Sequence, residues 1–445
     1  MNFKTWLQGV AVVAVCALPM TKALAQTPIE VLNQFATGDS QLRLAAAIGT
    51  LCPPGNRLSE RLQQDCNALV GAAFGGDGLV RGALGQIVAD NVNAATDRAL
   101  LGGLGMAQMP AGSSSRGRSM ASFGVHSYGN LASLGTPGTL SFSAGEDFGR
   151  WSVFGNFEYE DFGRDRTLNE DGFDGDRQTF LIGIDRRFSD RFNAGIAVSF
   201  DRSDLKFSGA SGSKKFDETR LLLFGNWTGE SGVYLDALAS RGWRDTDQVR
   251  RVAYGLGSGV SVNQQFAASF DTKTTSLAAT LGYHWQREGF GLDPFLTLEF
   301  ASIDADGYQE TASAPTGNGA GWAIIAADSK SDLTTLDVGM RATWVVSRPS
   351  SVWVPQVELA YVNVLDQDEN DTVVRFVGDQ SASVGLGTFN FGLANDAADD
   401  DYFRLSLGMV AQWSRGRAGF INIATRLGER GYDSTTLTLG LRFEL

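Results

Sequence analysis

Apolar and polar residues alternate with a period of two from Trp151 to the end of the chain. The last segment is the clearest: Leu439, Leu441, Phe443 and Leu445 alternate with glycine and polar residues. Because successive side chains of a β-strand point to opposite faces of the sheet, this period places the apolar residues on one face. The pattern therefore predicts strands, and not helices, for this part of the chain.

About twelve such segments occur, each of roughly 9–14 residues, the length with which a tilted strand crosses a membrane. We expect strands at residues 151–161, 176–188, 191–203, 216–228, 231–243, 272–286, 291–303, 332–346, 351–365, 401–414, 417–427 and 434–445.

The connections between these segments alternate between short and long. Short connections are expected at residues 189–190, 229–232, 287–291, 347–350 and 414–416. Long connections are expected at 162–175, 204–215, 244–271, 304–331 and 366–400, with a medium one at 428–433. Such alternation is typical of membrane barrels, which have short periplasmic turns and longer outer loops.

The two faces of the expected strands differ in chemistry. One face carries Leu, Ile, Val, Phe and Trp without charge, and the other carries small, polar and charged residues. Tryptophans lie towards the strand ends, as in an interfacial girdle: Trp227, Trp285, Trp344, Trp353 and Trp413. We predict an all-β transmembrane barrel of up-and-down antiparallel strands over 151–445, preceded by a small α-helical domain. The alternative is a soluble all-β protein with one buried and one solvated face.

The N-terminal segment, residues 1–25, has the features of a secretory signal peptide. Lys4 precedes an apolar stretch at 9–20, and residues 23–25 (ALA) form a small-x-small cleavage site. The stretch is shorter than the roughly 20 residues of a membrane-spanning helix. We therefore expect an exported protein.

Residues 26–100 are predicted to form a small helical head with a disulfide. Leu58, Leu62 and Leu69 have helical spacing, and a second helix is expected at 84–100. Cys52 and Cys66 are the cysteines left after signal removal, so a bridge between them would join the end of one helix to the middle of the next. Two buried free thiols are the alternative. Residues 101–150 are expected to be a flexible linker, which includes a possible pore-threading segment.

Charge and histidine content exclude several functions. The net charge of −13 argues against a nucleic-acid partner. Only two histidines occur, and the head has none, which excludes a Ser-His-Asp or Cys-His site within it. We expect no catalytic residues, metal or cofactor. Charged residues of the polar face either bias ion passage or pair with one another: Glu158, Asp185, Arg187, Arg341, Glu358, Arg404 and Arg442.

The strand-and-loop pattern, with the segments TFLIGID (179–185) and LLLFGNW (221–227), resembles the autotransporter family of type V secretion over about 150–445. The resemblance implies a twelve-stranded outer-membrane translocator barrel whose lumen carries the upstream segment outward. It also implies a helix left in the pore, for which 84–100 and 119–150 are the candidates. The head lacks the Asn-Asn junction of self-cleaving members and is expected to stay attached.

The same resemblance implies the partners. These are outer-membrane lipid and lipopolysaccharide, the secretion translocon, and the barrel assembly machinery, which reads the C-terminal strand. The assembly signal would comprise Leu439, Leu441, Phe443 and Leu445, although the family usually ends in an aromatic residue. We expect a monomeric barrel in the outer membrane of a Gram-negative bacterium.

Three functions are compatible with the sequence. The first is a non-enzymatic translocator that exports or displays its own short N-terminal segment. The second is a passive, porin-like channel with a periplasmic head. The third is an outer-membrane enzyme, which would have to use His126 or His284.

Overall fold

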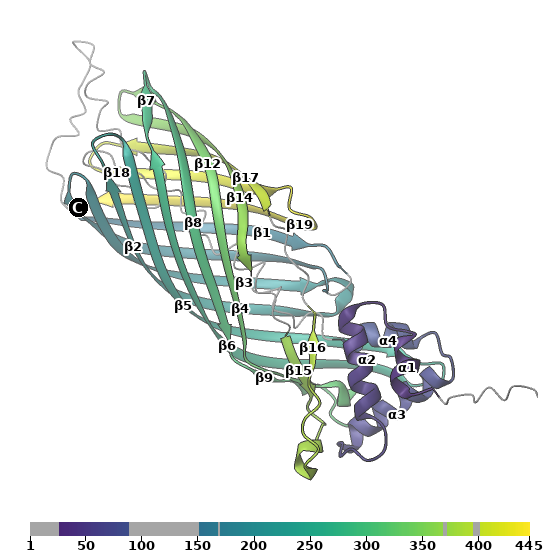
Figure 1. Ribbon diagram of the computed structural model, residues 1–445. Coiled ribbons are helices and arrows are strands. Elements are labelled where there is room, and N and C mark those ends of the chain that lie inside the picture. Colours follow the sequence, from purple (N-terminus) through teal and green to yellow (C-terminus); the bar gives the residue numbers. More distant parts are fainter. Residues whose placement is uncertain (1–25, 89–150, 168–169, 368–371, 395–400) are drawn as a thin grey trace, which may run out of the picture.

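The computed structural model describes residues 26–88, 151–167, 170–367, 372–394 and 401–445. Twelve antiparallel strands form a closed barrel, with helices packed against one end (Figure 1). Closure is made by the pairing of β1 with β19, which extends from Ser152↔Glu444 to Arg164↔Tyr432. The predicted up-and-down membrane barrel is therefore confirmed.

Each barrel strand pairs with its neighbours in the chain. The barrel strands are β1 (Trp151–Arg164), β2 (Phe173–Ser189), β3 (Phe192–Phe207), β4 (Gly212–Thr228), β5 (Val233–Gly255), β6 (Ser261–Tyr283), β8 (Phe290–Ala305), β12 (Ser329–Trp344), β14 (Ser351–Gln367), β17 (Asp401–Trp413), β18 (Arg417–Leu427) and β19 (Tyr432–Glu444).

Shorter elements lie at both ends of the barrel. At the end with the short turns, here called the turn end, are β7 (Trp285–Arg287) and β13 (Val346–Arg348). At the opposite, outer end are η3 (Ser208–Ala210), β9 (Tyr308–Gln309), β10 (Thr311–Ala312), η4 (Ala320–Trp322), β11 (Ile324–Ala326), β15 (Thr372–Phe376), η5 (Ser381–Val384) and β16 (Phe391–Leu393).

The head consists of four helices at the outer end. They are α1 (Pro28–Asn33), α2 (Asp39–Leu51), α3 (Glu60–Phe74) and α4 (Val80–Ile87). Thr27 and Glu30 form a capping box on α1, and the Ser59 hydroxyl caps α3 by accepting a hydrogen bond from the Leu62 amide. None of the described helices is long and apolar enough to cross a membrane.

The outer surface of the barrel shows where the membrane ends. Outward-facing residues of β3 are apolar from Phe192 to Phe200, and the next one is Arg202. Arg202 forms an exposed ion pair with Asp217 of β4 at 3.1 Å. The apolar stretch is about nine residues long, which suits a tilted strand in hydrocarbon. Beyond this boundary the strands continue into water.

The prediction of a long loop at 244–271 is wrong, because most of these residues belong to strands β5 and β6. β5 continues to Gly255 and β6 starts at Ser261, and the two strands stay paired to their ends. β3 and β4 likewise cover most of the loop expected at 204–215. Outside the membrane both faces of these strands carry polar residues, so the apolar period that reveals a strand is lost there.

Aromatic rings cover glycines on the lumen side of the wall. In five cases a ring lies over the glycine directly opposite it on the neighbouring strand, where a Cβ atom would collide with the ring. The pairs are Phe154 with Gly183, Phe224 with Gly195, Tyr234 with Gly282, Phe295 with Gly339, and Phe420 with Gly440. Near the turn end, each ring occupies the space that a side chain would take at the facing glycine, so the large ring fits against the lumen side of the wall.

We expect Gly440→Val to destabilise the barrel by about 1–3 kcal/mol, because the Phe420 ring must leave its rotamer. The readout is the temperature at which the compact band is lost on an unboiled gel. Gly225→Val is the control, since the nearest atom to its added Cβ would be 3.6 Å away. Equal melting of the two variants would contradict the packing argument.

Candidate head-docking site and translocator lumen

The head and the outer end of the barrel share one hydrophobic core. Val252, Phe266, Trp322 and Phe376 come from the outer end and are at most 1% exposed. They belong to the same cluster as the helix residues Leu44, Ile48, Leu62, Leu69 and Leu84. Removal of the head would expose these apolar side chains of the outer end to water. Because burial of each apolar side chain stabilises the fold by about 1.5–3 kcal/mol, that exposure would cost free energy.

Asp65 of α3 holds the loop that contains η4. Its carboxylate accepts hydrogen bonds from the backbone amides of Gly319 and Gly321, both at 2.9 Å, and from Arg61 at 2.8 Å. A Cβ atom at Gly321 would lie 2.5 Å from the Cα atom of Leu62, so only glycine allows this approach. A buried carboxylate with three charge-assisted partners is a strong anchor.

Arg250 of β5 is a second anchor and is 1% exposed. Its guanidinium binds both carboxylate oxygens of Glu310, at 2.8 and 2.6 Å. It also donates to the carbonyl oxygens of Trp322 at 2.8 Å and Ile87 at 3.2 Å. The Phe266 ring lies 4.6 Å from the guanidinium carbon. One side chain thus joins the end of α4 to β5, β6 and η4.

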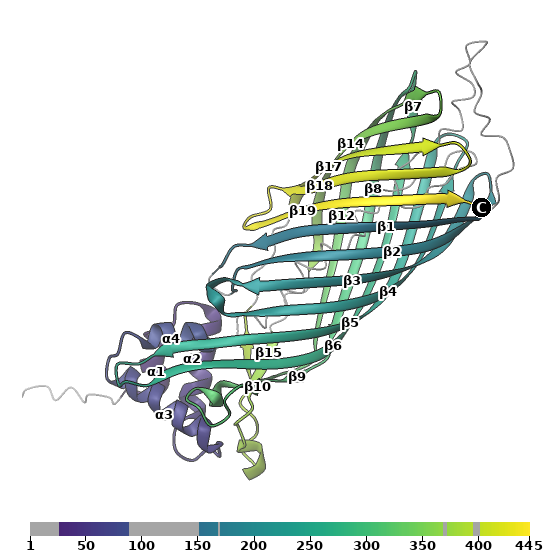
Figure 2. The ribbon, with the colours of Figure 1, turned by 180° about the vertical axis from the view of Figure 1, so that it is seen from behind.

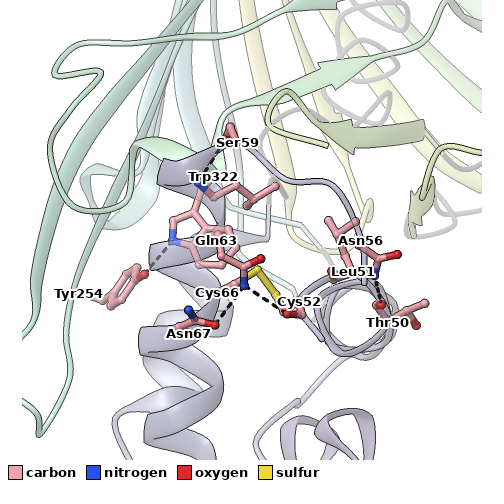
Figure 3. The surroundings of a disulfide bond; sticks show 11 residues. Thr50, Leu51, Cys52, Asn56, Ser59, Gln63, Cys66, Asn67, Tyr254 and Trp322 are labelled. Carbon is pink, nitrogen blue, oxygen red and sulfur yellow. Dashed lines mark hydrogen bonds between the residues drawn. A yellow bond between two sulfur atoms is a disulfide. The ribbon is translucent and has the colours of Figure 1, made fainter. Parts of the chain in front are cut away.

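The disulfide links the two longest helices of the head. Cys52 caps the end of α2 and Cys66 lies in the middle of α3, with 5.5 Å between their Cα atoms (Figure 3). The structure thus contains the bridge that the sequence predicts.

Trp322, a core residue of the outer end, donates its indole N–H to the Tyr254 hydroxyl at 2.8 Å. Burial raises the pKa of Tyr254, so this hydroxyl stays protonated.

Charged side chains on the lumen wall are arranged in pairs. Arg442 binds both oxygens of Asp185, at 2.6 and 2.8 Å, and Arg341 binds Glu358 at 2.6 Å. Further pairs are Arg404 with Asp337, and Glu218 with both Arg220 and Arg244. Glu158 accepts a hydrogen bond from Thr438. This geometry favours mutual pairing of these charges over a role in ion passage.

Other expectations have mixed outcomes. The helix expected at 84–100 ends at Ile87 and packs on β5 at the outer end, so its described part does not lie in the pore. The remainder of that helix, the signal peptide and residues 101–150 lie outside the described residues. In the part of the chain that the structure describes, no group of three or more His, Cys, Asp or Glu is placed to hold a metal ion.

The C-terminal strand has the expected orientation. Leu439, Leu441 and Phe443 face outward and are between 41% and 53% exposed, and Leu445 is exposed at the turn end. The role of these residues as an assembly signal stays a prediction.

Of the two histidines, His284 contacts Asp293 at the turn end, and the structure does not describe His126.

Sequence reasoning missed the anchors Asp65, Arg250, Glu310 and Trp322. One signal was present: residues 255–259 read GLGSG, which is typical of a turn, and Val252, Val262 and Phe266 flank it at even spacing. That pattern indicates a hairpin and not a loop. The pairing of Arg250 with Glu310 joins residues far apart in the chain, and no local pattern reveals it.

The family model described as "Autotransporter beta-domain" matches residues 153–424. The chain belongs to the autotransporter beta-domain family. Members of this family are outer-membrane barrels of Gram-negative bacteria, and this barrel has the same location.

Similar proteins include two curated ones and a solved structure. "Esterase EstA" of Pseudomonas aeruginosa and that of Pseudomonas putida are each 22% identical over 201 residues, which is 44% of this chain and 29% of theirs. The chain therefore spans less than a third of these relatives. The translocator domain of the autotransporter NalP from Neisseria meningitidis is 14% identical, with a TM-score of 0.51, and the match covers 66% of this chain and 88% of that one. This likeness supports the barrel fold.

We expect Asp65→Ala to loosen the head, because it leaves the buried amides of Gly319 and Gly321 without their acceptor, at a cost of about 1–3 kcal/mol. Hydrogen exchange of residues 319–322 and of α3 should become faster, while barrel strands stay protected. Gln64→Ala, at an exposed position on the same helix, is the control and should leave exchange unchanged. Unchanged exchange in Asp65→Ala would contradict the anchoring role.

Proposed function

We propose that the protein is a non-enzymatic translocator that exports its own N-terminal head and keeps it docked on the outside of the cell. The observation that carries this proposal is the position of the head. It packs against the outer end, where the longest connections lie, between β8 and β12 and between β14 and β17, and such connections face outward in outer-membrane barrels. Trp151 and the C-terminus lie at the opposite end, joined by a backbone hydrogen bond of 2.9 Å (Figure 2).

This arrangement limits the route of the chain. Residues 89–150 connect Val88 at the outer end to Trp151 at the turn end. A stretch of roughly sixty residues is long enough, since a strand rises about 3.3 Å per residue. A path outside the barrel would take irregular backbone through hydrocarbon, where its polar groups would lack partners. We therefore infer that the lumen is the route by which the chain is exported.

The buried contacts between the head and the barrel favour a head that remains attached after export. Its core is completed by Trp322 and Phe376, and its anchors Asp65 and Arg250 are buried. Release would leave buried apolar and charged groups uncovered, which is costly. Display on the cell surface is therefore the proposed outcome of transport, and secretion into the medium is not.

Assembly partners complete the proposal. The secretion translocon would export the chain, and the barrel assembly machinery would recognise the outward residues Leu439, Leu441, Phe443 and Leu445. Lipid and lipopolysaccharide would surround the folded monomeric barrel. Support for these partners comes from family membership and from the apolar outer wall.

Topology can be tested with two epitopes in intact cells. An epitope inserted between Gly75 and Gly78 in the head should bind antibody without permeabilisation. The same epitope in the short turn at residues 349–350 should bind only after permeabilisation. A head epitope that also requires permeabilisation would place the head in the periplasm and contradict export.

Conductance separates the translocator from a passive channel. We expect the full-length protein in a planar bilayer to carry no large steady current, because the proposal routes the exported chain through the lumen, whose described wall is lined by paired charges. A large steady current would favour the channel.

The similarity to EstA raises the question of esterase activity. EstA is named an esterase, but this chain spans 29% of it. Ester hydrolysis by the purified protein that is lost on changing His126 or His284 would favour an enzyme over the proposed translocator.

A further inference from the structure

The lipid-facing wall has a hollow where β1 meets β19. Six outward positions form one cross-strand row, in which small residues leave a gap. The row reads Ile182, Gly155, Leu441, Gly419, Ala411 and Trp353 across β2, β1, β19, β18, β17 and β14, strands that lie side by side in Figure 2. We call the hollow over Gly155, Gly419 and Ala411 the trough. Its volume is about 680 Å³, and its lining is almost entirely apolar.

Large side chains form the two walls of the trough. On the side of the membrane centre, Phe157, Leu439 and Ile421 occupy the next outward row. On the side of the turn end, Phe443 and Trp413 occupy the corresponding positions. The side chains that line a gap lose dispersion contacts, which an apolar occupant of the trough would restore.

Arg417 breaks the apolar wall at the turn end. It is exposed, points outward, and pairs in register with Trp413 on one side and Phe443 on the other. Within the described ranges it has no carboxylate partner among the ion pairs of the barrel. An unpaired cation at the membrane boundary, directly beside an apolar trough, is complementary to an anionic group with an attached hydrocarbon chain.

We propose that the trough binds one phospholipid of the periplasmic leaflet. An acyl chain lies over Gly155 and Gly419, and the phosphate faces Arg417. The leaflet follows from the position of Arg417 at the turn end, which faces the periplasm in outer-membrane barrels. The site covers the junction of the first and last strands, where a bound lipid would protect the closing pair. Binding in the trough does not require export of the head, but the assignment to the periplasmic leaflet rests on the barrel orientation of the proposed function.

The test titrates phosphatidylglycerol into purified, folded, full-length protein and counts bound lipid by native mass spectrometry. Gly419→Leu crowds the trough, because its Cβ atom would lie 3.1 Å from Leu441 and 3.2 Å from Trp413 and displace these side chains into the hollow, and it should weaken one-to-one binding about ten-fold or more. Ala279→Leu adds the same side chain to an outward position of β6 outside the trough and should bind like the wild type. Loss of the compact gel band identifies any variant that misfolds, and Ala411→Leu then replaces Gly419→Leu.

The phosphate contact is tested separately. Arg417→Gln should lower affinity for phosphatidylglycerol about five-fold or more, whereas Arg287→Gln, exposed at another short turn, should not. Equal binding by the wild type, Gly419→Leu and Arg417→Gln would overturn the proposal. Tighter binding of lipid A than of phosphatidylglycerol would overturn the assignment to the periplasmic leaflet.

Discussion

The fold depends on the requirement that every backbone amide and carbonyl in hydrocarbon has a hydrogen-bond partner within the protein. A sheet meets this requirement only when its first and last strands pair. Here β1 and β19 pair from Ser152 to Arg164, so the sheet formed by the described strands closes on itself. The packing of side chains inside and outside the barrel wall is therefore arranged around this closed sheet.

The interior of the cylinder solves a packing problem. A barrel of this size has a lumen that is too wide for a simple hydrophobic core and narrower than that of a porin. Rings placed over glycines fill the lumen side of the wall near the turn end, and ion pairs such as Arg404 with Asp337 neutralise charges further along the lumen. Charges that neutralise one another line the lumen without fixing a strong ionic preference, which is compatible with the proposed transit of a polypeptide.

Beyond the apolar band, two of the same strands contact the head. β5 and β6 project beyond the apolar band and carry Val252, Phe266 and Arg250, which complete the core of the head. A head of this length has a limited core of its own, and small domains are marginally stable alone. Docking on the outer ends of β5 and β6 supplies further apolar contacts, so the head and the outer end of the barrel share one hydrophobic core.

The sequence alone determines the spanning region and part of the head. Lipid on one face and a wet lumen on the other impose the period of two, and the cysteine pair Cys52 and Cys66 predicts the bridge. The outer ends of β5 and β6 escape prediction because both of their faces meet water or protein. Only the tertiary structure decides that Asp65 meets Gly319 and that α4 packs on β5, because those contacts depend on segments brought together by barrel closure.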